Sequence, residues 1–291
     1  MITPELLAQV RRLTIRSRRA VEEVFAGAYR SAFRGRGLEF SEVREYVPGD
    51  DVRAIDWNVT ARAGRPFVKR FEEERELTVV IALDLSASLR FGTRARTKRE
   101  TAAEAGALLA LAASRNRDRV GLLLFTDGVE LYLPPSKSRS RALRVARELL
   151  AYEPEGTGTD VGAALSFLGR VLRRRAVVFV LSDWIASPFD RELALLARRH
   201  EVVVLEVGDP LERELPAAGL VSVRDLESGA SRTVDLGVGA ARAAWKAARA
   251  RHDRTLTEAF RRGRADRIDL LTGVPVAPVL VRHMEQRARM R

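Results

Sequence analysis

The apolar positions of the chain fall into short runs that predict buried strands. The run Leu77–Leu83 contains almost no polar residue, as expected of a strand that is covered on both faces. Three further runs have the same character: Arg119–Phe125, Ala176–Leu181 and Glu201–Val207. Residues 267–271 are a candidate for a last strand. Runs of this length fit the strands of a parallel sheet and are too short for a membrane span.

The stretches between these runs carry helix signals. Thr97-x-x-Glu100 is a capping box and predicts a helix that starts near Thr97. Ser187-Pro188 predicts another start, with a capping serine and proline at the first helical position, for a helix to Arg199. The other predicted helices cover residues 140–151, 161–172, 240–262 and 278–289. Alternating strands and helices predict an α/β fold with a doubly wound, mostly parallel sheet.

Turn signals divide the rest of the chain. Asp127-Gly128 predicts a hairpin into residues 129–133, and Ser228-Gly229 predicts another inside an insertion near residues 209–235. Residues 1–35 have a rough helical stripe, and residues 36–75 have the short apolar groups and turns of small strands packed beside the main sheet. We therefore expect an N-terminal helical and short-strand extension, residues 1–75, and an α/β domain, residues 76–291.

Composition narrows the class of protein. The 291 residues are 46% hydrophobic and 31% charged, as in ordinary soluble domains. The absence of cysteine excludes disulfides, a cysteine nucleophile and cysteine-based zinc sites. No signal-peptide pattern opens the chain, and no apolar run reaches the roughly 18 residues of a membrane span. We expect a cytoplasmic protein with no membrane span.

The net charge of +12 raises the question of an anionic partner. All but four of the 51 basic residues are arginine, and many lie in the C-terminal segment 236–291. That segment lacks the stacking aromatic residues of single-strand binders. We favour a solvated basic surface and do not expect nucleic acid as a partner, but binding through the basic C-terminal helix stays an alternative hypothesis.

Polar side chains follow the predicted strands at the points where they end. Asp84, Ser86 and Ser88 follow the first strand, Thr159 lies in a glycine-rich loop before a helix, and Asp183 follows residues 176–181. In an open α/β sheet these positions meet at the carboxyl edge, where ligands bind. Two carboxylates and three hydroxyls are hard oxygen ligands that suit Mg²⁺ or Mn²⁺. Taken alone, Asp-x-Ser-x-Ser fits a polar turn and helix cap equally well.

The order and spacing of these residues resemble a known type of site. Asp-x-Ser-x-Ser at residues 84–88, Thr-Asp-x-Gly-x-Ala-Leu at 159–165 and Ser-Asp at 182–183 resemble the metal-ion-dependent adhesion site of von Willebrand factor A domains. The resemblance covers about residues 77–207. It implies that Asp84, Ser86, Ser88, Thr159 and Asp183 carry the metal, and that a partner protein supplies an acidic side chain to it.

The segment upstream of the first strand resembles a more specific family. Residues 39–57 (EFSEVREYVPGDDVRAIDW), then Ala61-Arg62 and residues 71–76, look like the hallmark of the bacterial domain of unknown function 58 family. The resemblance implies a partnership with a MoxR-type AAA+ ATPase in protein-complex assembly or maturation. Within the segment we expect Phe40, Tyr46 and Trp57 to anchor cores or interfaces, and Asp50, Asp51, Arg53 and Asp56 to form local ion pairs and turn hydrogen bonds. A docking face beside the metal is the alternative.

Signatures of catalysis are missing from the sequence. It has no nucleotide-binding glycine fingerprint and no Gly-x-Ser-x-Gly nucleophile elbow. The three histidines, His200, His252 and His283, are scattered, and we expect none near the metal edge. We therefore predict a non-enzymatic protein-interaction module, with no catalytic residues. A Mg²⁺-dependent phosphoesterase is the alternative, because a bound Mg²⁺ can polarise a phosphoryl oxygen.

Overall fold

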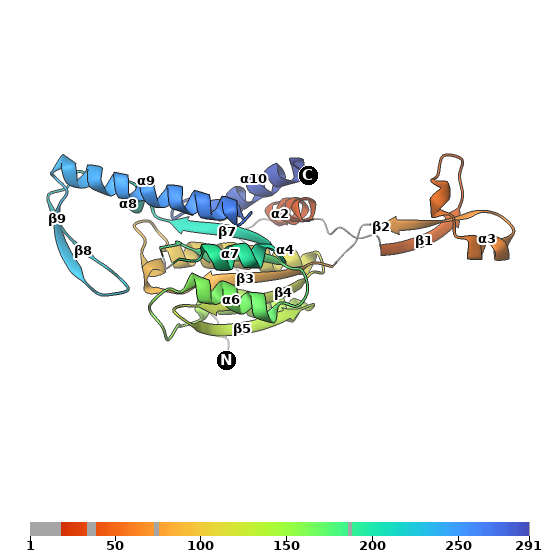
Figure 1. Cartoon of the computed structure of the whole chain (residues 1–291), viewed down its shortest axis with the longest axis horizontal. Coiled ribbons are helices and arrows are strands. Elements are labelled where there is room, and N and C mark those ends of the chain that lie inside the picture. Colours follow the sequence, from red (N-terminus) through yellow and green to blue (C-terminus); the bar gives the residue numbers. More distant parts are fainter. Residues whose placement is uncertain (1–18, 34–38, 73–75, 186–187, 291) are drawn as a thin grey trace.

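The computed structural model describes residues 19–33, 39–72, 76–185 and 188–290. Its centre is a six-stranded sheet with the spatial order β10-β7-β6-β3-β4-β5, in which only β5 is antiparallel (Figure 1). The strands are β3 (Thr78–Asp84), β4 (Arg119–Phe125), β5 (Val129–Ser136), β6 (Val177–Ser182), β7 (Glu201–Gly208) and β10 (Asp266–Leu271). The predicted α/β class and doubly wound, mostly parallel sheet are confirmed.

The order of the strands fixes where a ligand site can form. Counted along the chain, the six strands lie in the order 3-2-1-4-5-6, so the connections reverse direction between β3 and β6. These two neighbours pair in parallel from Val79–Val177 to Leu83–Leu181. Their carboxyl ends therefore open onto the crevice where doubly wound sheets bind ligands. Asp84 and Asp183 are at these two strand ends.

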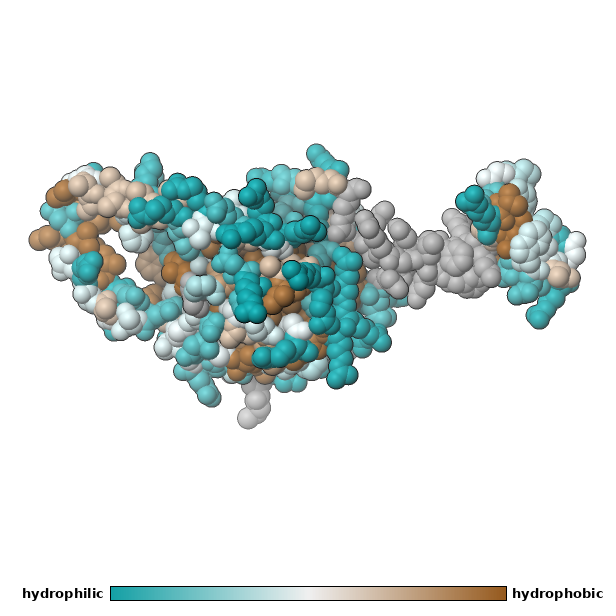
Figure 2. Space-filling view, viewed as in Figure 1, coloured by the Kyte–Doolittle hydropathy of each residue, from teal (hydrophilic) through white to brown (hydrophobic). Residues whose placement is uncertain are grey.

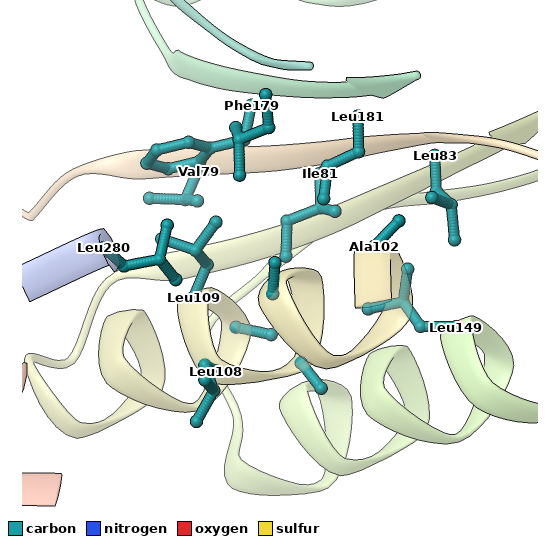
Figure 3. Close-up of a cluster of buried hydrophobic side chains, with 14 of the residues drawn as sticks. Val79, Ile81, Leu83, Ala102, Leu108, Leu109, Leu149, Phe179, Leu181 and Leu280 are labelled. Atoms are coloured by element: carbon teal, nitrogen blue, oxygen red, sulfur yellow. The ribbon is translucent and has the colours of Figure 1, made fainter. Parts of the chain in front are cut away.

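Helices cover both faces of the sheet and give two apolar cores. One face packs against α2 (Arg19–Ala32), α4 (Lys98–Arg115), α5 (Arg139–Ala151) and α10 (Val276–Arg289), with Ile81 and Phe179 among its strand residues (Figure 3). The other face packs against α6 (Val161–Val171), α7 (Asp190–Ala197) and α9 (Gly239–Arg262). Strand β3 alternates between the two cores, which explains why its sequence has no exposed polar period.

The segment before β3 has two different environments. Helix α2 belongs to the core of the sheet, because Phe25, Tyr29 and Phe33 are buried in its cluster. Strands β1 (Glu39–Glu45) and β2 (Phe67–Glu72) pair with each other and carry helix α3 (Trp57–Ala63) between them. Figure 1 shows this small unit standing apart from the sheet, so the prediction that it packs beside the sheet was wrong. Residues 1–18 lie outside the described residues, and the boundary at residue 75 stays a prediction.

The acidic residues of this small unit act locally, as the sequence predicted. Asp50 accepts two hydrogen bonds from the Arg44 guanidinium, at 2.7 and 2.8 Å. Asp51 accepts from the backbone of Arg53, and Asp56 caps α3. Trp57, the first residue of α3, is in contrast 68% exposed, so it is not a core anchor among the described residues. The side chain of Phe40 lies outside the described residues.

Other element boundaries differ from the sequence prediction in informative ways. The capping box at Thr97 is present, and α4 begins at Lys98. Helix α7 begins only at Asp190, so the predicted start at Ser187-Pro188 was wrong; Ser187 lies outside the described residues. The reason is that Phe189 is buried against Trp184 and Phe260, which draws the chain inward before the helix starts. The short helix α8 (Pro210–Arg213) was not predicted.

An exposed hairpin follows α8 on the way to α9. Strands β8 (Leu220–Arg224) and β9 (Ser231–Asp235) pair with each other only, and the turn between them contains Gly229 at φ +72°. This confirms the predicted Ser228-Gly229 turn. The hairpin projects beyond the body of the molecule on the left of Figure 1.

Candidate metal centre

Asp84 is the innermost residue of the candidate site. It ends β3 and is fully buried. Its Oδ1 accepts a hydrogen bond from the backbone of Ser86 at 2.8 Å, and its Oδ2 accepts one from the Ser182 hydroxyl at 2.7 Å. Both donors are uncharged. Burial raises the pKa of Asp84 most, and the negative charge of Asp183 raises it further. The two hydrogen bonds act in the opposite direction, and the resulting pKa is about 7.

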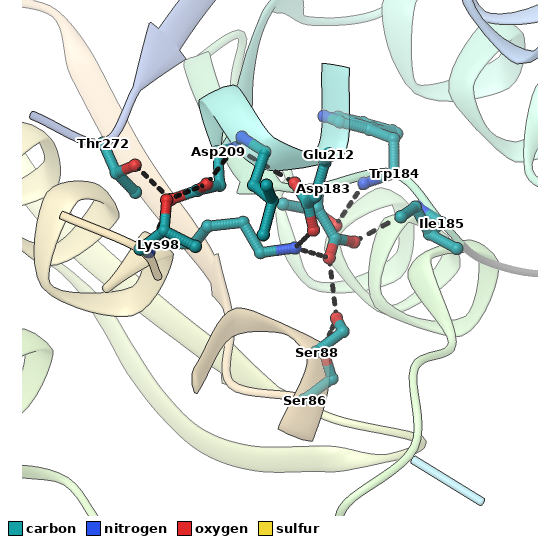
Figure 4. Close-up of polar contacts among 12 residues, drawn as sticks. Ser86, Ser88, Lys98, Asp183, Trp184, Ile185, Asp209, Glu212 and Thr272 are labelled. Atoms are coloured by element: carbon teal, nitrogen blue, oxygen red, sulfur yellow. Dashed lines mark hydrogen bonds and ion pairs between the residues drawn. The ribbon is translucent and has the colours of Figure 1, made fainter. Parts of the chain in front are cut away.

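The two serines join Asp84 to the second carboxylate. The hydroxyl oxygens of Ser86 and Ser88 lie 3.1 Å apart, and Ser88 Oγ donates to Asp183 Oδ2 at 2.7 Å (Figure 4). Asp183 is buried, as are Asp84 and Ser86. The structure thus brings four of the five predicted residues into one hydrogen-bonded chain at the switch point of the sheet.

The backbone after β6 is turned so that it supports this carboxylate. Trp184 has φ +60°, a left-handed conformation that is uncommon for a bulky residue and costs of order 1 kcal/mol or more. Its N–H donates to Ser182 Oγ at 3.0 Å, and the N–H of Ile185 donates to Asp183 Oδ1 at 3.2 Å. The Trp184 ring is held by Phe189 and Phe260, at centroid distances of 4.8 and 4.9 Å. Aromatic packing therefore holds the turn that fixes Asp183.

A lysine that the sequence analysis missed lies in the same cluster. Lys98, the first residue of α4, is 1% exposed, and its Nζ contacts Asp183 Oδ2 at 2.8 Å and Glu212 Oε1 at 2.6 Å (Figure 4). Burial alone would lower the pKa of Lys98, but the two carboxylates more than offset it and raise the pKa. Lys98 is thus held protonated. The sequence feature that could have drawn attention to Lys98 is that the chain has only four lysines.

Glu212 reaches Lys98 because Asp209 fixes the start of α8. Asp209 and Glu212 form a capping box, and Asp209 also accepts hydrogen bonds from the hydroxyls of Thr93 and Thr272. Burial tends to raise the pKa of Asp209, whereas the bonds from Thr272 and Thr93 lower it to a net value below the usual range. Asp209 remains ionised and ties the loop after β3, the end of β10 and α8 together.

The fifth predicted residue, Thr159, lies in a neighbouring loop. That loop is joined to the serine segment by a backbone hydrogen bond from Ala87 N to Thr157 O at 2.9 Å. The hydroxyl of Thr159 does not join the chain of Ser86, Ser88 and Asp183 in any contact of the described residues. It donates instead to Oε1 of Glu227, at 2.7 Å. Glu227 is in the turn of the β8–β9 hairpin, and sequence reasoning had not connected it with the site.

The geometry can be tested against the needs of a hard cation. Two oxygens that share an octahedral Mg²⁺ lie about 3 Å apart, which matches the two serine hydroxyls. Asp183 and Glu212 share the single positive charge of Lys98, and Asp84 accepts from the uncharged donors Ser86 and Ser182, so the carboxylates of the cluster outnumber its ammonium group. Within the described residues no group of three or more His, Asp or Glu side chains could hold a metal. A cation at this position would have to be held by the serine hydroxyls together with the Asp84 and Asp183 carboxylates.

One histidine lies nearer to the site than we expected. Burial lowers the pKa of His252, on α9, and the charge of Asp183 acts on it in the opposite direction. Its Nε2 atom has no hydrogen-bond partner among the described residues.

Comparison with known proteins places the chain in a family. The sequence model of the family described as "Protein of unknown function DUF58" matches residues 42–255. An uncharacterized protein of Mycobacterium tuberculosis is 36% identical over 233 residues, which are 79% of this chain and 73% of that protein. The chain belongs to the DUF58 family. The match includes both the small β1–β2 unit and the candidate site of this DUF58 chain.

Solved structures support the fold of the DUF58 chain. An aerotolerance-related membrane protein of Bacteroides fragilis superposes with a TM-score of 0.50 at 20% identity, covering 74% of this chain and all of that chain. Proximal thread matrix protein 1 from the mussel byssus, described with a zinc-occupied MIDAS motif, has a TM-score of 0.37 at 16% identity, covering 46% of this chain and 39% of its own. The second likeness is too slight to carry an argument. The first likeness supports the α/β fold described above.

No helix among the described residues of the DUF58 chain has the length and apolar character needed to cross a membrane.

Proposed function

We propose that this DUF58 chain is a non-enzymatic protein-interaction module that holds a divalent cation, Mg²⁺ or Mn²⁺, at the carboxyl edge of its sheet. The observation that supports this function is the buried, hydrogen-bonded chain of Asp84, Ser86, Ser88 and Asp183 at the switch point. These residues and Thr159 would hold the cation. When bound, it would supply a positive charge that attracts a carboxylate of a partner protein.

The charged residues of the cluster fit a binding site better than a catalytic site. Lys98 is held protonated between two carboxylates, so it is not available as a base. Asp183 accepts bonds from Lys98 and Ser88, and Asp84 is enclosed and fully buried. These groups keep their positions and leave the cation's outer side for a ligand. As partner we propose a MoxR-type AAA+ ATPase that presents an acidic side chain, from the resemblance of the β1–β2 segment.

The first part of the test is a calorimetric titration with Mg²⁺. We expect one Mg²⁺ per chain for the wild type, and binding at least about tenfold weaker for Asp84→Ala and for Ser88→Ala, because each removes an oxygen from the site. Glu258→Ala is the matched control, since it removes an exposed carboxylate from α9 away from the cluster. Circular dichroism shows whether each variant is folded. Equal Mg²⁺ affinity of all four proteins would reject the site.

The second part tests the partner. A purified MoxR-type ATPase from the same organism should be retained by the immobilised chain in Mg²⁺, and lost in EDTA or with Ser88→Ala. Retention that is indifferent to Mg²⁺ would contradict capture through the cation.

A metal-dependent phosphoesterase is the second candidate, favoured by the unpartnered Nε2 of His252 and by the nearby charge of Asp183. Mg²⁺-dependent hydrolysis of p-nitrophenyl phosphate that His252→Ala abolishes would favour this candidate over a binding module.

A further inference from the structure

The β8–β9 hairpin is held to the rest of the molecule by few contacts. Its strands pair only with each other, and most of their side chains are exposed. Exposed apolar residues include Leu220, Val223 and Leu226, and Figure 2 shows brown, hydrophobic patches on the hairpin at the left. A hairpin with so little burial has no core of its own. Its position therefore depends on what its turn contacts.

The turn is built so that the side chain of Glu227 points toward the loop that carries Thr159. Asp225 accepts hydrogen bonds from the backbone of Glu227 at 2.9 Å and of Ser228 at 3.1 Å, and Gly229 takes the left-handed conformation that closes the turn. Residues 225, 226, 228 and 229 are exposed, whereas Glu227 is half-buried. Its Oε1 lies 2.7 Å from Thr159 Oγ1, one of the residues assigned to the cation.

We propose that Glu227 is a cation ligand that the chain supplies to its own site, in the position that a partner's carboxylate takes. The inference rests on the proposed function. A carboxylate in hydrogen-bond contact with a ligand hydroxyl is next to the cation that this hydroxyl binds. The backbone hydrogen bond from Ala87 to Thr157 joins the Thr159 loop to the serine segment, so Glu227 lies on the side of the site that this loop borders. The partner then competes with Glu227 and releases the hairpin.

A simple hydrogen bond that latches the hairpin is the competing explanation, and Glu227→Gln separates the two. Glutamine keeps an oxygen that can accept from Thr159 but lacks the charge that a hard cation prefers. A latch survives this substitution, whereas a ligand does not. Glu227→Ala removes both the accepting oxygen and the charge. Glu258→Gln on α9 is the matched control for loss of one exposed carboxylate.

The experiment uses the full chain, with Mg²⁺ alone as the probe. We measure Mg²⁺ affinity by calorimetry and amide hydrogen exchange of residues 225–229 with and without Mg²⁺. We expect Glu227→Gln and Glu227→Ala each to bind Mg²⁺ about tenfold more weakly than wild type and Glu258→Gln. Mg²⁺ should slow exchange in the turn of wild type and of Glu258→Gln, but of neither Glu227 variant.

The outcomes separate this inference from the proposed function. If wild type binds Mg²⁺ in a way that depends on Asp84, and Glu227→Gln binds it equally well, the site stands and Glu227 is only a latch. If Mg²⁺ binds neither wild type nor the variants, the proposed function fails and this inference fails with it.

Discussion

Lys98 and Asp118 are both buried, but they differ in whether a group of opposite charge lies in contact with them. Lys98 lies between two carboxylates, so its charge is balanced where it is buried. Asp118 accepts bonds from Tyr29 Oη at 3.1 Å and from the backbone of Leu77 at 2.9 Å, both uncharged donors. Burial is the largest cause that raises the pKa of Asp118, to about 6. Through these two hydrogen bonds, Asp118 joins α2 to the start of β3. Above about pH 6 its carboxylate carries a negative charge that neither donor balances.

We predict that Asp118→Asn changes how stability depends on pH. A carboxyl group whose pKa is raised on folding binds more protons in the folded state, so its contribution is present below the unfolded pKa of 3.8 and is lost as pH rises through about 6. The free energy of unfolding of wild type, relative to that of Asp118→Asn, should fall by about 1–3 kcal/mol between pH 4 and pH 7. Urea unfolding at both pH values measures it, and parallel curves for the two proteins would contradict it.

The loop before α6 contains a glycine, Gly156, that leaves no room for a side chain. Gly156 donates its N–H to Glu130 Oε1 at 2.8 Å and lies against residues 126 and 127. A Cβ atom at Gly156 would meet Asp127 Oδ1 at 2.5 Å, far inside van der Waals contact. At Gly158 the nearest atom would be Asp127 Cβ, at an ordinary 3.5 Å. The loop that carries Thr159 is therefore fixed by a close approach at one of its two glycines.

We predict that Gly156→Ala displaces this loop and that Gly158→Ala does not. The first variant should lose about 1–3 kcal/mol of stability from overpacking and bind Mg²⁺ more weakly, because Thr159 moves with the loop. The second should stay within about 0.5 kcal/mol of wild type. Thermal unfolding and Mg²⁺ titration of both variants decide it; equal effects at the two positions would show that the close approach is unimportant.

The strands could be predicted well from the sequence because each central strand is apolar on both faces, and β4 runs over Arg119–Phe125 as predicted. The start of α7 could not, because the burial of Phe189 depends on Phe260, which is distant in sequence. The same holds for the site. The ends of β3 and β6 were predictable, whereas the Lys98–Glu212 and Thr159–Glu227 contacts span 114 and 68 residues and follow only from the folded chain.

Two of the three tryptophans of the chain, Trp57 and Trp184, lie in opposite environments. Trp184 is 1% exposed between Phe189 and Phe260, while Trp57 is 68% exposed on the small β1–β2 unit. The sequence predicted an anchoring role for Trp57 and none for Trp184, but burial depends on which elements meet. The six-stranded sheet has described helices on both faces, and Trp184 is buried in one of the two cores that they form.

We predict that the two tryptophans differ sharply in their effect on stability. Trp184→Ala should cost about 3–5 kcal/mol, as for a large core aromatic residue, and Trp57→Ala less than about 0.5 kcal/mol. Guanidinium unfolding followed by circular dichroism measures both. A large loss in Trp57→Ala would show that Trp57 is an anchor after all.

The antiparallel edge strand β5 also limits how the molecule can associate. It ends in Pro134-Pro135-Ser136, beside Val120 and Leu122 of β4. Proline has no N–H to offer to a further strand, and edge strands without such protection are templates for aggregation. At this end of β5, a strand of a second chain cannot pair with the sheet. Neighbouring copies of the protein therefore cannot join their sheets there.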